Sequence, residues 1–141
     1  MAVLKQLVNT KELNIDHLVS LASGKVSPVY VRYDDCLDTF FIMFSSLDTE
    51  SVVHYIDEFV ALLYTPDRKE VVGIQVDDFK EFAKKNRTVA KAWNVKVDCG
   101  HFVDLGDLYS VKDKKERVIV QEVAKVAESS FHYDDRVLVH A

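Results

Sequence analysis

The sequence predicts one α+β domain, in which an antiparallel β-meander of four to five strands packs with two to three helices. Three observations support this fold class. Short β-branched and aromatic runs, bounded by turn residues, fill residues 28–76. Apolar residues recur at helical spacing on both sides of that segment. The chain has 141 residues, of which 48% are hydrophobic, so residues 1–141 suffice for a single domain with its own core.

The first helix is expected over residues 9–22. Asn9 or Thr10 is a suitable N-cap, because either side chain can accept a hydrogen bond from a backbone N–H of the first turn. The helix should stop at Ser23-Gly24, since glycine readily adopts the left-handed conformation that ends many helices. The stripe at helical spacing consists of Leu13, His17, Leu18 and Leu21.

Five runs within residues 28–76 favour strands. They are Pro28–Tyr33, Thr39–Phe44, Val52–Tyr55, Phe59–Tyr64 and Glu70–Val76. Pro66 and Asp67 lie between the last two runs, where proline presets φ and aspartate bonds its own backbone. We therefore predict a hairpin with a tight connection between Tyr64 and Glu70, within an antiparallel meander.

Two further helices are expected in the second half of the chain. One covers residues 77–86, with Asp77 or Asp78 as its cap, and the other covers residues 113–128. Val118 and Val120 leave a strand as the alternative for the first turns of the latter. Residues 88–112 allow either a short strand around Val95–Val97 or a helix ending near Asn94, and Arg136–His140 are expected to form a last strand or an ordered tail.

Charge and cysteine content limit the partners and the compartment. The formal net charge of −5 disfavours general nucleic-acid binding, despite basic clusters around residues 84–91 and 112–117. No stretch approaches the roughly 18 apolar residues of a membrane helix, and Lys5 interrupts the only candidate leader. Two widely spaced cysteines, Cys36 and Cys99, are typical of reduced thiols. We therefore expect a cytoplasmic protein that contacts neither nucleic acid nor membrane.

Two segments of residues 29–80 carry a resemblance. Tyr33-Asp34-Asp35-Cys36-Leu37-Asp38 resembles the Tyr-Asp-x-x-x-Asp opening of a short prokaryotic domain family of unknown function, and Val72-Gly73-Ile74 resembles its closing strand. The resemblance implies a β-meander and carries over no functional residue. Small members of this kind can sit beside toxin-like proteins, so the resemblance also implies an antitoxin-like or partner-binding role.

Asp34, Asp35 and Asp38 cluster at one turn of the predicted sheet. Several carboxylates at short range suit a hard cation such as Ca²⁺ or Mg²⁺. However, the run lacks the spacing of an EF-hand loop, and aspartate is favoured in turns because its side chain bonds nearby backbone N–H groups. We favour turn chemistry over a metal site. Similarly, we expect His54, which lies near Asp57 and Glu58, to be a partly buried structural residue.

Cys99, His101 and Asp104 form the densest set of transition-metal ligand types, with Asp98 alongside. A thiolate with an imidazole suits zinc, but two such ligands cannot close a tetrahedral site unless His132 or His140 folds back to them. The same Cys–His pair suggests a nucleophile and its base, which would need a third, orienting group. These residues are the candidate site of the alternative function, a small-ligand or metal-dependent enzyme.

We favour a non-enzymatic interaction or oligomerisation module with no cofactor. The four glycines form neither a phosphate-binding loop nor a nucleophile elbow. The aromatic stripe Tyr30, Tyr33, Phe40, Phe41 and Phe44 is more typical of a core than of a base-stacking surface. The uncharged runs Thr39–Phe44 and Phe59–Tyr64 lack the charges that protect an edge strand, so we predict a homo-oligomer, with a protein partner as the second expectation.

Overall fold

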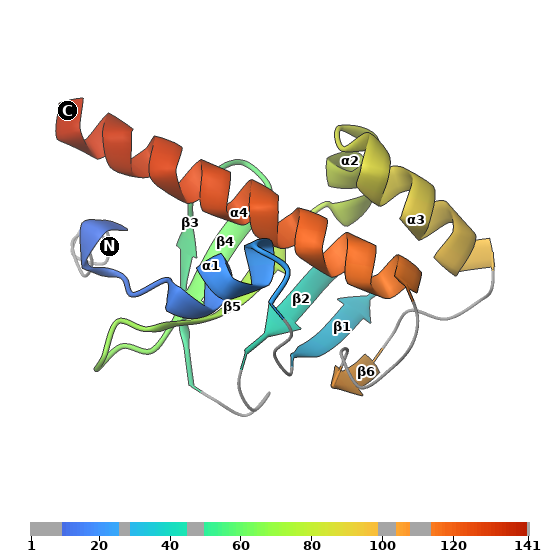
Figure 1. Cartoon of the computed structure of the whole chain (residues 1–141), viewed down its shortest axis with the longest axis horizontal. Coiled ribbons are helices and arrows are strands. Elements are labelled where there is room, and N and C mark those ends of the chain that lie inside the picture. The colour runs from blue at the N-terminus through green and yellow to red at the C-terminus, as the bar shows by residue number, and fades with distance from the viewer. Residues whose placement is uncertain (1–9, 26–28, 45–49, 99–103, 108–113, 141) are drawn as a thin grey trace.

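In the described residues, four α-helices lie on one side of a six-stranded antiparallel sheet (Figure 1). The computed structural model describes residues 10–25, 29–44, 50–98, 104–107 and 114–140, and within 93–98, 104–107, 114–116 and 133–140 it describes the backbone alone. The α+β fold class is confirmed. In this part of the chain, no helix is long and apolar enough to cross a membrane.

Five strands lie within residues 30–76, as predicted: β1 (Tyr30–Asp34), β2 (Thr39–Met43), β3 (Val52–Tyr55), β4 (Val60–Tyr64) and β5 (Val71–Val76). The sixth, β6 (Asp104–Asp107), comes from the segment for which the sequence left a strand or a helix open. The spatial order is β3-β4-β5-β2-β1-β6. The sheet is therefore not one simple meander, because β2 pairs with β5 rather than with β3.

The predicted hairpin between Tyr64 and Glu70 is confirmed. Thr65 N–H donates to the carbonyl of Glu70 at 2.9 Å, and Lys69 N–H donates to the carbonyl of Thr65 at 2.8 Å. Lys69 adopts a positive φ of 55°, and Asp67 Oδ1 accepts the N–H of Arg68. The connection thus closes through the local turn chemistry that the sequence predicted.

Helix α1 (Asp16–Ala22) begins later than predicted, after a short 3-10 helix, η2 (Thr10–Glu12). Asn14 lies between them and forms an isolated parallel bridge with Glu70. The backbone N–H and C=O of Asn14 therefore bond to Lys69 and Val71, respectively, beside the sheet and not within a helix. The predicted stop is confirmed: Gly24 has a φ of 85° and its N–H donates to Leu21, while Lys25 N–H donates to Ser20. This pair of bonds is a Schellman motif.

The second half of the chain is more helical than expected. The helix predicted over 77–86 is α2 (Phe79–Lys84), and α3 (Arg87–Asp98) follows it directly. The strand alternative around Val95–Val97 is therefore wrong. Helix α4 (Lys114–His140) confirms the helix predicted over 113–128 from Lys114 onward and continues through Arg136–His140, where the last strand or ordered tail was expected. Long helices gain from continuous packing, and Ile119, Val120, Val123, Ala124 and Ala127 are all fully buried.

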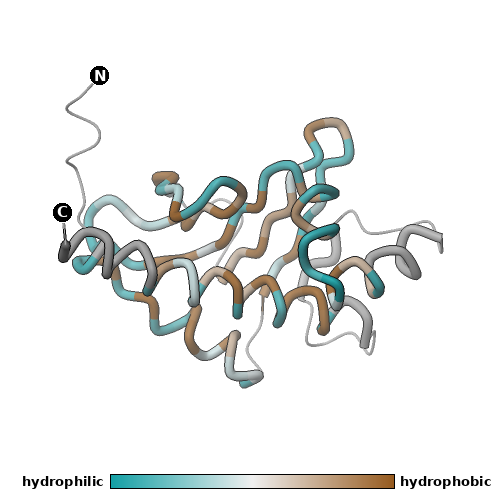
Figure 2. The backbone as a smooth tube through the Cα atoms, turned by 90° about the horizontal axis from the view of Figure 1, so that it is seen from above, coloured by the Kyte–Doolittle hydropathy of each residue, from teal (hydrophilic) through white to brown (hydrophobic). Residues whose placement is uncertain are grey.

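Strand alternation divides the sheet into a helix-covered face and a face on which no described helix packs, here called the helix-free face. On the covered face, the register aligns Leu62, Ile74, Ile42 and Val31 in one row, and all four are fully buried. The helix-free face carries two rows: Val53, Leu63, Gly73, Met43, Tyr30, and Tyr55, Ala61, Gln75, Phe41, Arg32. The perpendicular view shows α4 along one side of the sheet (Figure 2). Side chains that alternate along each strand therefore meet two different environments.

Candidate functional site

The acidic turn between β1 and β2 is held by its own hydrogen bonds. Asp34 Oδ1 accepts the backbone N–H groups of Cys36 at 3.0 Å and of Leu37 at 3.1 Å. This is the turn chemistry favoured from the sequence. It directs Leu37, which is 69% exposed, into solvent.

Asp38 does not bond within this turn as Asp34 does; its hydrogen bonds connect the β1–β2 turn to helix α2. Its Oδ1 accepts the hydroxyl of Tyr33 at 2.7 Å, and its Oδ2 accepts the N–H of Lys80 at 3.2 Å. Its backbone carbonyl accepts the N–H of Phe79 at 3.0 Å. The expected cap, Asp78, has a left-handed φ of 48° and its side chain makes no cap hydrogen bond. Asp38 therefore satisfies the first turn of α2 from a distant part of the chain.

Asp34, Asp35 and Cys36 place two carboxylates and a thiol within 4.8 Å of one another. A hard cation would use the carboxylates but not the thiol, and a softer metal would prefer more sulfur or imidazole. Cys36 is a free and exposed thiol. The turn accounts for the position of Asp34, and exposed carboxylates at a tight turn need no ion. We assign no metal site here.

The candidate enzyme site around Cys99 lies outside the described residues. Cys99 and His101 fall in the undescribed segment 99–103, and Asp104 begins β6, where only its backbone is described. Asp98 ends α3. Helix α4 runs unbroken to His140, and His132 Nε2 lies 3.8 Å from Glu128 Oε2, one turn back on the same helix. Glu128 is therefore a local partner of His132, and the candidate site itself stays a prediction.

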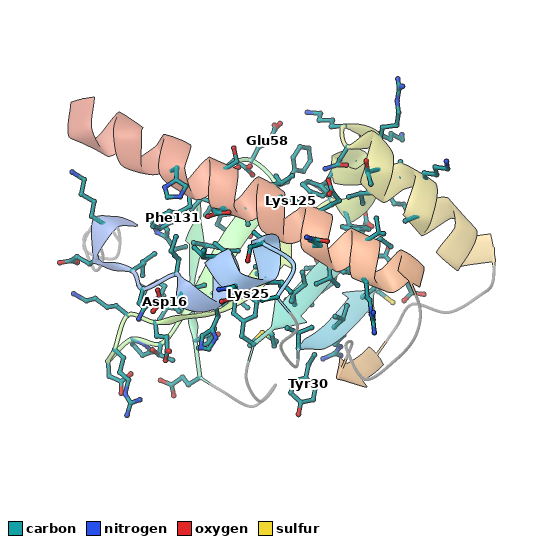
Figure 3. The ribbon with its side chains drawn as sticks, viewed as in Figure 1. Asp16, Lys25, Tyr30, Glu58, Lys125 and Phe131 are labelled. Carbon is teal, nitrogen blue, oxygen red and sulfur yellow. The ribbon has the colours of Figure 1, made fainter. Side chains whose placement is uncertain are left out.

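The expected aromatic core is divided between the two faces. Phe40 and Tyr33 are buried beneath the helices, where Phe40 stacks on Phe79 with ring centroids 4.7 Å apart. Tyr30 lies on the helix-free face, is 38% exposed and projects away from α4 (Figure 3).

Part of the basic cluster at 84–91 is neutralised, because Lys84 and Lys85 pair with Glu81 and Glu58 at 3.2 and 3.0 Å. His54 is half-buried on β3, as expected.

The edge of the sheet at β3 is the most exposed apolar part of the described strands. Val53 and Tyr55 are 46% and 51% exposed, and both belong to the helix-free face. The Tyr55 hydroxyl donates to the carboxylate of Asp77, and Gln75 donates to the other Asp77 oxygen at 3.0 Å. The hydrogen bond to Asp77, with partial burial, raises the pKa of Tyr55 above its usual value. Tyr55 therefore stays protonated and fixed at this edge.

A small cavity that the sequence did not predict lies where the β3–β4 turn meets α2 and α4. Its volume is about 250 Å³, below the usual range of pockets for drug-sized ligands. Its lining combines two carboxylates, a lysine, an amide, two phenyl rings and a valine: Asp57, Glu58, Lys85, Asn86, Phe59, Phe82 and Val126. The only sequence signal was the acidic pair before Phe59 and β4, because Phe82, Lys85, Asn86 and Val126 come from distant segments.

No family model, curated protein or solved structure matches this chain.

Proposed function

We propose that this protein is a non-catalytic interaction module that forms a homodimer through β3, the strand at one end of the described sheet. The observation that carries the proposal is an uncharged edge strand whose exposed residues offer both backbone and side-chain contacts. Strands β1, β2, β4 and β5 each have a described neighbour on both sides, whereas β3 pairs only with β4 among the described strands.

The register fixes which backbone groups of β3 point outward. Ile56 N–H donates to the carbonyl of Val60 at 2.9 Å, so these two residues form a hydrogen-bonded pair. Hydrogen-bonded and non-hydrogen-bonded pairs alternate along an antiparallel ladder. The pair His54–Leu62 is therefore hydrogen-bonded, and Val53 and Tyr55 direct their N–H and C=O groups away from β4. These groups form the template for an added strand.

Side chains favour the same contact. Val52, Val53, His54 and Tyr55 carry no Lys, Asp, Glu or Pro, the residues that protect natural edges. A four-residue strand alone would give a weak dimer, so the adjoining helix-free face must contribute apolar contact. Two copies related by a two-fold axis would align their β3 strands antiparallel, and this symmetry is the commonest in soluble oligomers.

Two further expectations belong to this proposal. The exposed Cys36 thiol suits a reducing compartment, which supports a cytoplasmic location. The resemblance of residues 29–80 supports a partner-binding role of the antitoxin type, in which a foreign strand would use the same edge.

Sedimentation equilibrium with an edge variant tests the proposal. The wild-type chain should show a species of about twice 16.1 kDa at micromolar concentration. Val53→Pro removes one outward N–H but none of the N–H groups that pair with β4, so the variant should be a folded monomer.

Val53→Thr keeps the outward N–H and should remain dimeric, which makes it the matched control. A single wild-type species of 16.1 kDa, unchanged by a tenfold rise in concentration, would contradict the proposal.

A further inference from the structure

The cavity beside the β3–β4 turn has a rigid frame. Asp57 Oδ1 accepts the N–H groups of Phe59 at 2.8 Å and Val60 at 2.6 Å, which fixes the turn. Asp57 Oδ2 accepts the hydroxyl of Ser130 at 2.8 Å, which ties the turn to α4. The rings of Phe59 and Phe82 meet edge to face, with centroids 6.2 Å apart. The apolar floor is therefore already in place before any ligand arrives.

A cation from the chain itself lies at the mouth of this cavity. Lys85 Nζ is 4.8 Å from the centroid of the Phe59 ring and 3.0 Å from Glu58 Oε1. The ammonium thus makes a cation–π contact and an ion pair at once. Figure 3 shows Glu58 projecting at the upper edge of the molecule, beyond α4.

The contact made by Lys85 is weak enough to be exchanged. The side chains of Lys85 and Glu58 are 62% and 69% exposed, and exposed ion pairs contribute little because water and salt screen them. The frame of the cavity does not depend on Lys85, since Asp57, Ser130 and the two phenyl rings hold it. A second cation of suitable shape can therefore replace the lysine without opening the fold.

The geometry points to a binding site for an alkylammonium group, which displaces Lys85 from the Phe59 ring and from Glu58. An apolar floor of Phe59, Phe82 and Val126 suits the methyl or methylene groups of such a ligand. The carboxylates of Asp57 and Glu58 suit its positive charge and disfavour an anion. A volume of about 250 Å³ suits a headgroup or one side chain. This site is separate from the β3 edge and does not require a dimer.

Binding of choline is the direct test, because its neutral isostere 3,3-dimethylbutan-1-ol has the same shape without the charge. The signals of the Phe59 and Phe82 ring protons are followed by NMR in the full-length protein. Choline should shift them saturably, and the alcohol should bind at least about fivefold more weakly. The third probe is Nα-acetyl-lysine N-methylamide, whose side-chain ammonium stays charged. Comparing its binding with that of choline distinguishes a peptide lysine from a free quaternary cation as the source of the ammonium.

Variants give effects of opposite sign. Lys85→Met removes the internal competitor and should tighten choline binding about fivefold, whereas Glu58→Gln should weaken it by a similar factor. Lys84→Met is the matched control, since Lys84 pairs with Glu81 and does not line the cavity, and it should change nothing. Equal binding of choline and the alcohol, no binding of any ammonium probe, or weaker binding to Lys85→Met would overturn the inference.

Discussion

Two tyrosines on opposite faces of the sheet make the same contact in different surroundings. Tyr33, on the helix-covered face, donates its hydroxyl to Asp38 and is 7% exposed. Tyr55, on the helix-free face, donates to Asp77 and is 51% exposed. Water competes for the second hydrogen bond but hardly for the first. The helix-free face is itself packed at Ala61, Leu63 and Met43, which are buried. Its β3 edge, where Val53 and Tyr55 lie, therefore keeps groups available for contact with another molecule.

The largest difference between the faces should appear on removing a core ring. Phe79 is fully buried and stacks on Phe40, so Phe79→Ala should lower the free energy of unfolding by about 3–5 kcal/mol. Val53→Ala, on the helix-free face, should cost under about 1 kcal/mol in the monomer. Urea denaturation measures both values. Similar losses for the two variants would contradict the contrast between the packed core and the exposed β3 edge.

Gly73 lies in the closely packed part of the helix-free face, beside the buried Met43 and Leu63, and has no spare room. A Cβ at this position would lie 2.6 Å from Met43 Sδ and 2.8 Å from the carbonyl oxygen of Ile42. Gly73→Ala should therefore destabilise the fold by about 1–3 kcal/mol. Gln75→Ala, on the same strand and face, is the control and should cost less. Thermal unfolding followed by circular dichroism distinguishes the two.

Asp38 should matter more than its neighbours in the acidic turn. Asp38→Ala removes the acceptor for Lys80 N–H and for the Tyr33 hydroxyl, and should cost about 1–2 kcal/mol. Asp35→Ala changes an exposed carboxylate and should stay within about 0.5 kcal/mol of wild type. Chemical denaturation at neutral pH gives both numbers. Equal effects would mean that net negative charge, rather than the cap, decides stability at this turn.

Alkaline pH should weaken the fold through Tyr33. Burial, and then the hydrogen bond to Asp38, raises the pKa of Tyr33 above its usual value. The folded state then keeps a proton that the unfolded chain loses above its pKa of about 10, so stability falls as the pH rises beyond that value. The loss attributable to Tyr33 should be about 1 kcal/mol by pH 11.

Tyr33→Phe should remove this part of the pH dependence, and Tyr55→Phe should remove less because Tyr55 is half exposed. Unfolding curves from pH 8 to pH 11 measure the slopes. A wild-type slope that Tyr33→Phe leaves unchanged would assign the alkaline loss to other groups.

Local signals allowed much of the fold to be predicted. The Pro66-Asp67 turn and the stop at Gly24 depend on neighbouring residues alone, and both are confirmed. The identity of the edge strands was predicted wrongly. Runs 39–44 and 59–64 were expected at edges because they carry no charge, but β2 and β4 lie inside the sheet. Strands that are apolar on both faces are typical of interior positions, where neighbours cover both sides.

The candidate sites were less predictable, because they combine residues that are distant in sequence. Asp38 was grouped with Asp34 by sequence proximity, and only the packing of α2 against the β1–β2 turn gives it a different role. The cavity needs Phe59 beside Lys85, a contact that depends on how α2 packs beside the β3–β4 turn. Pattern and propensity describe one element at a time, whereas these contacts are set by tertiary packing.

The distant cap of α2 has a consequence for the order of folding. A six-residue helix such as α2 is not stable by itself, because it forms too few hydrogen bonds to offset the conformational entropy lost in the first turn. The first amide groups of α2 find their acceptor in Asp38, so protection from hydrogen exchange at Phe79 and Lys80 can arise only after β1 and β2 have paired. The hairpin and the helix should then open together as one cooperative unit, although Asp38 and Lys80 are 42 positions apart in the chain.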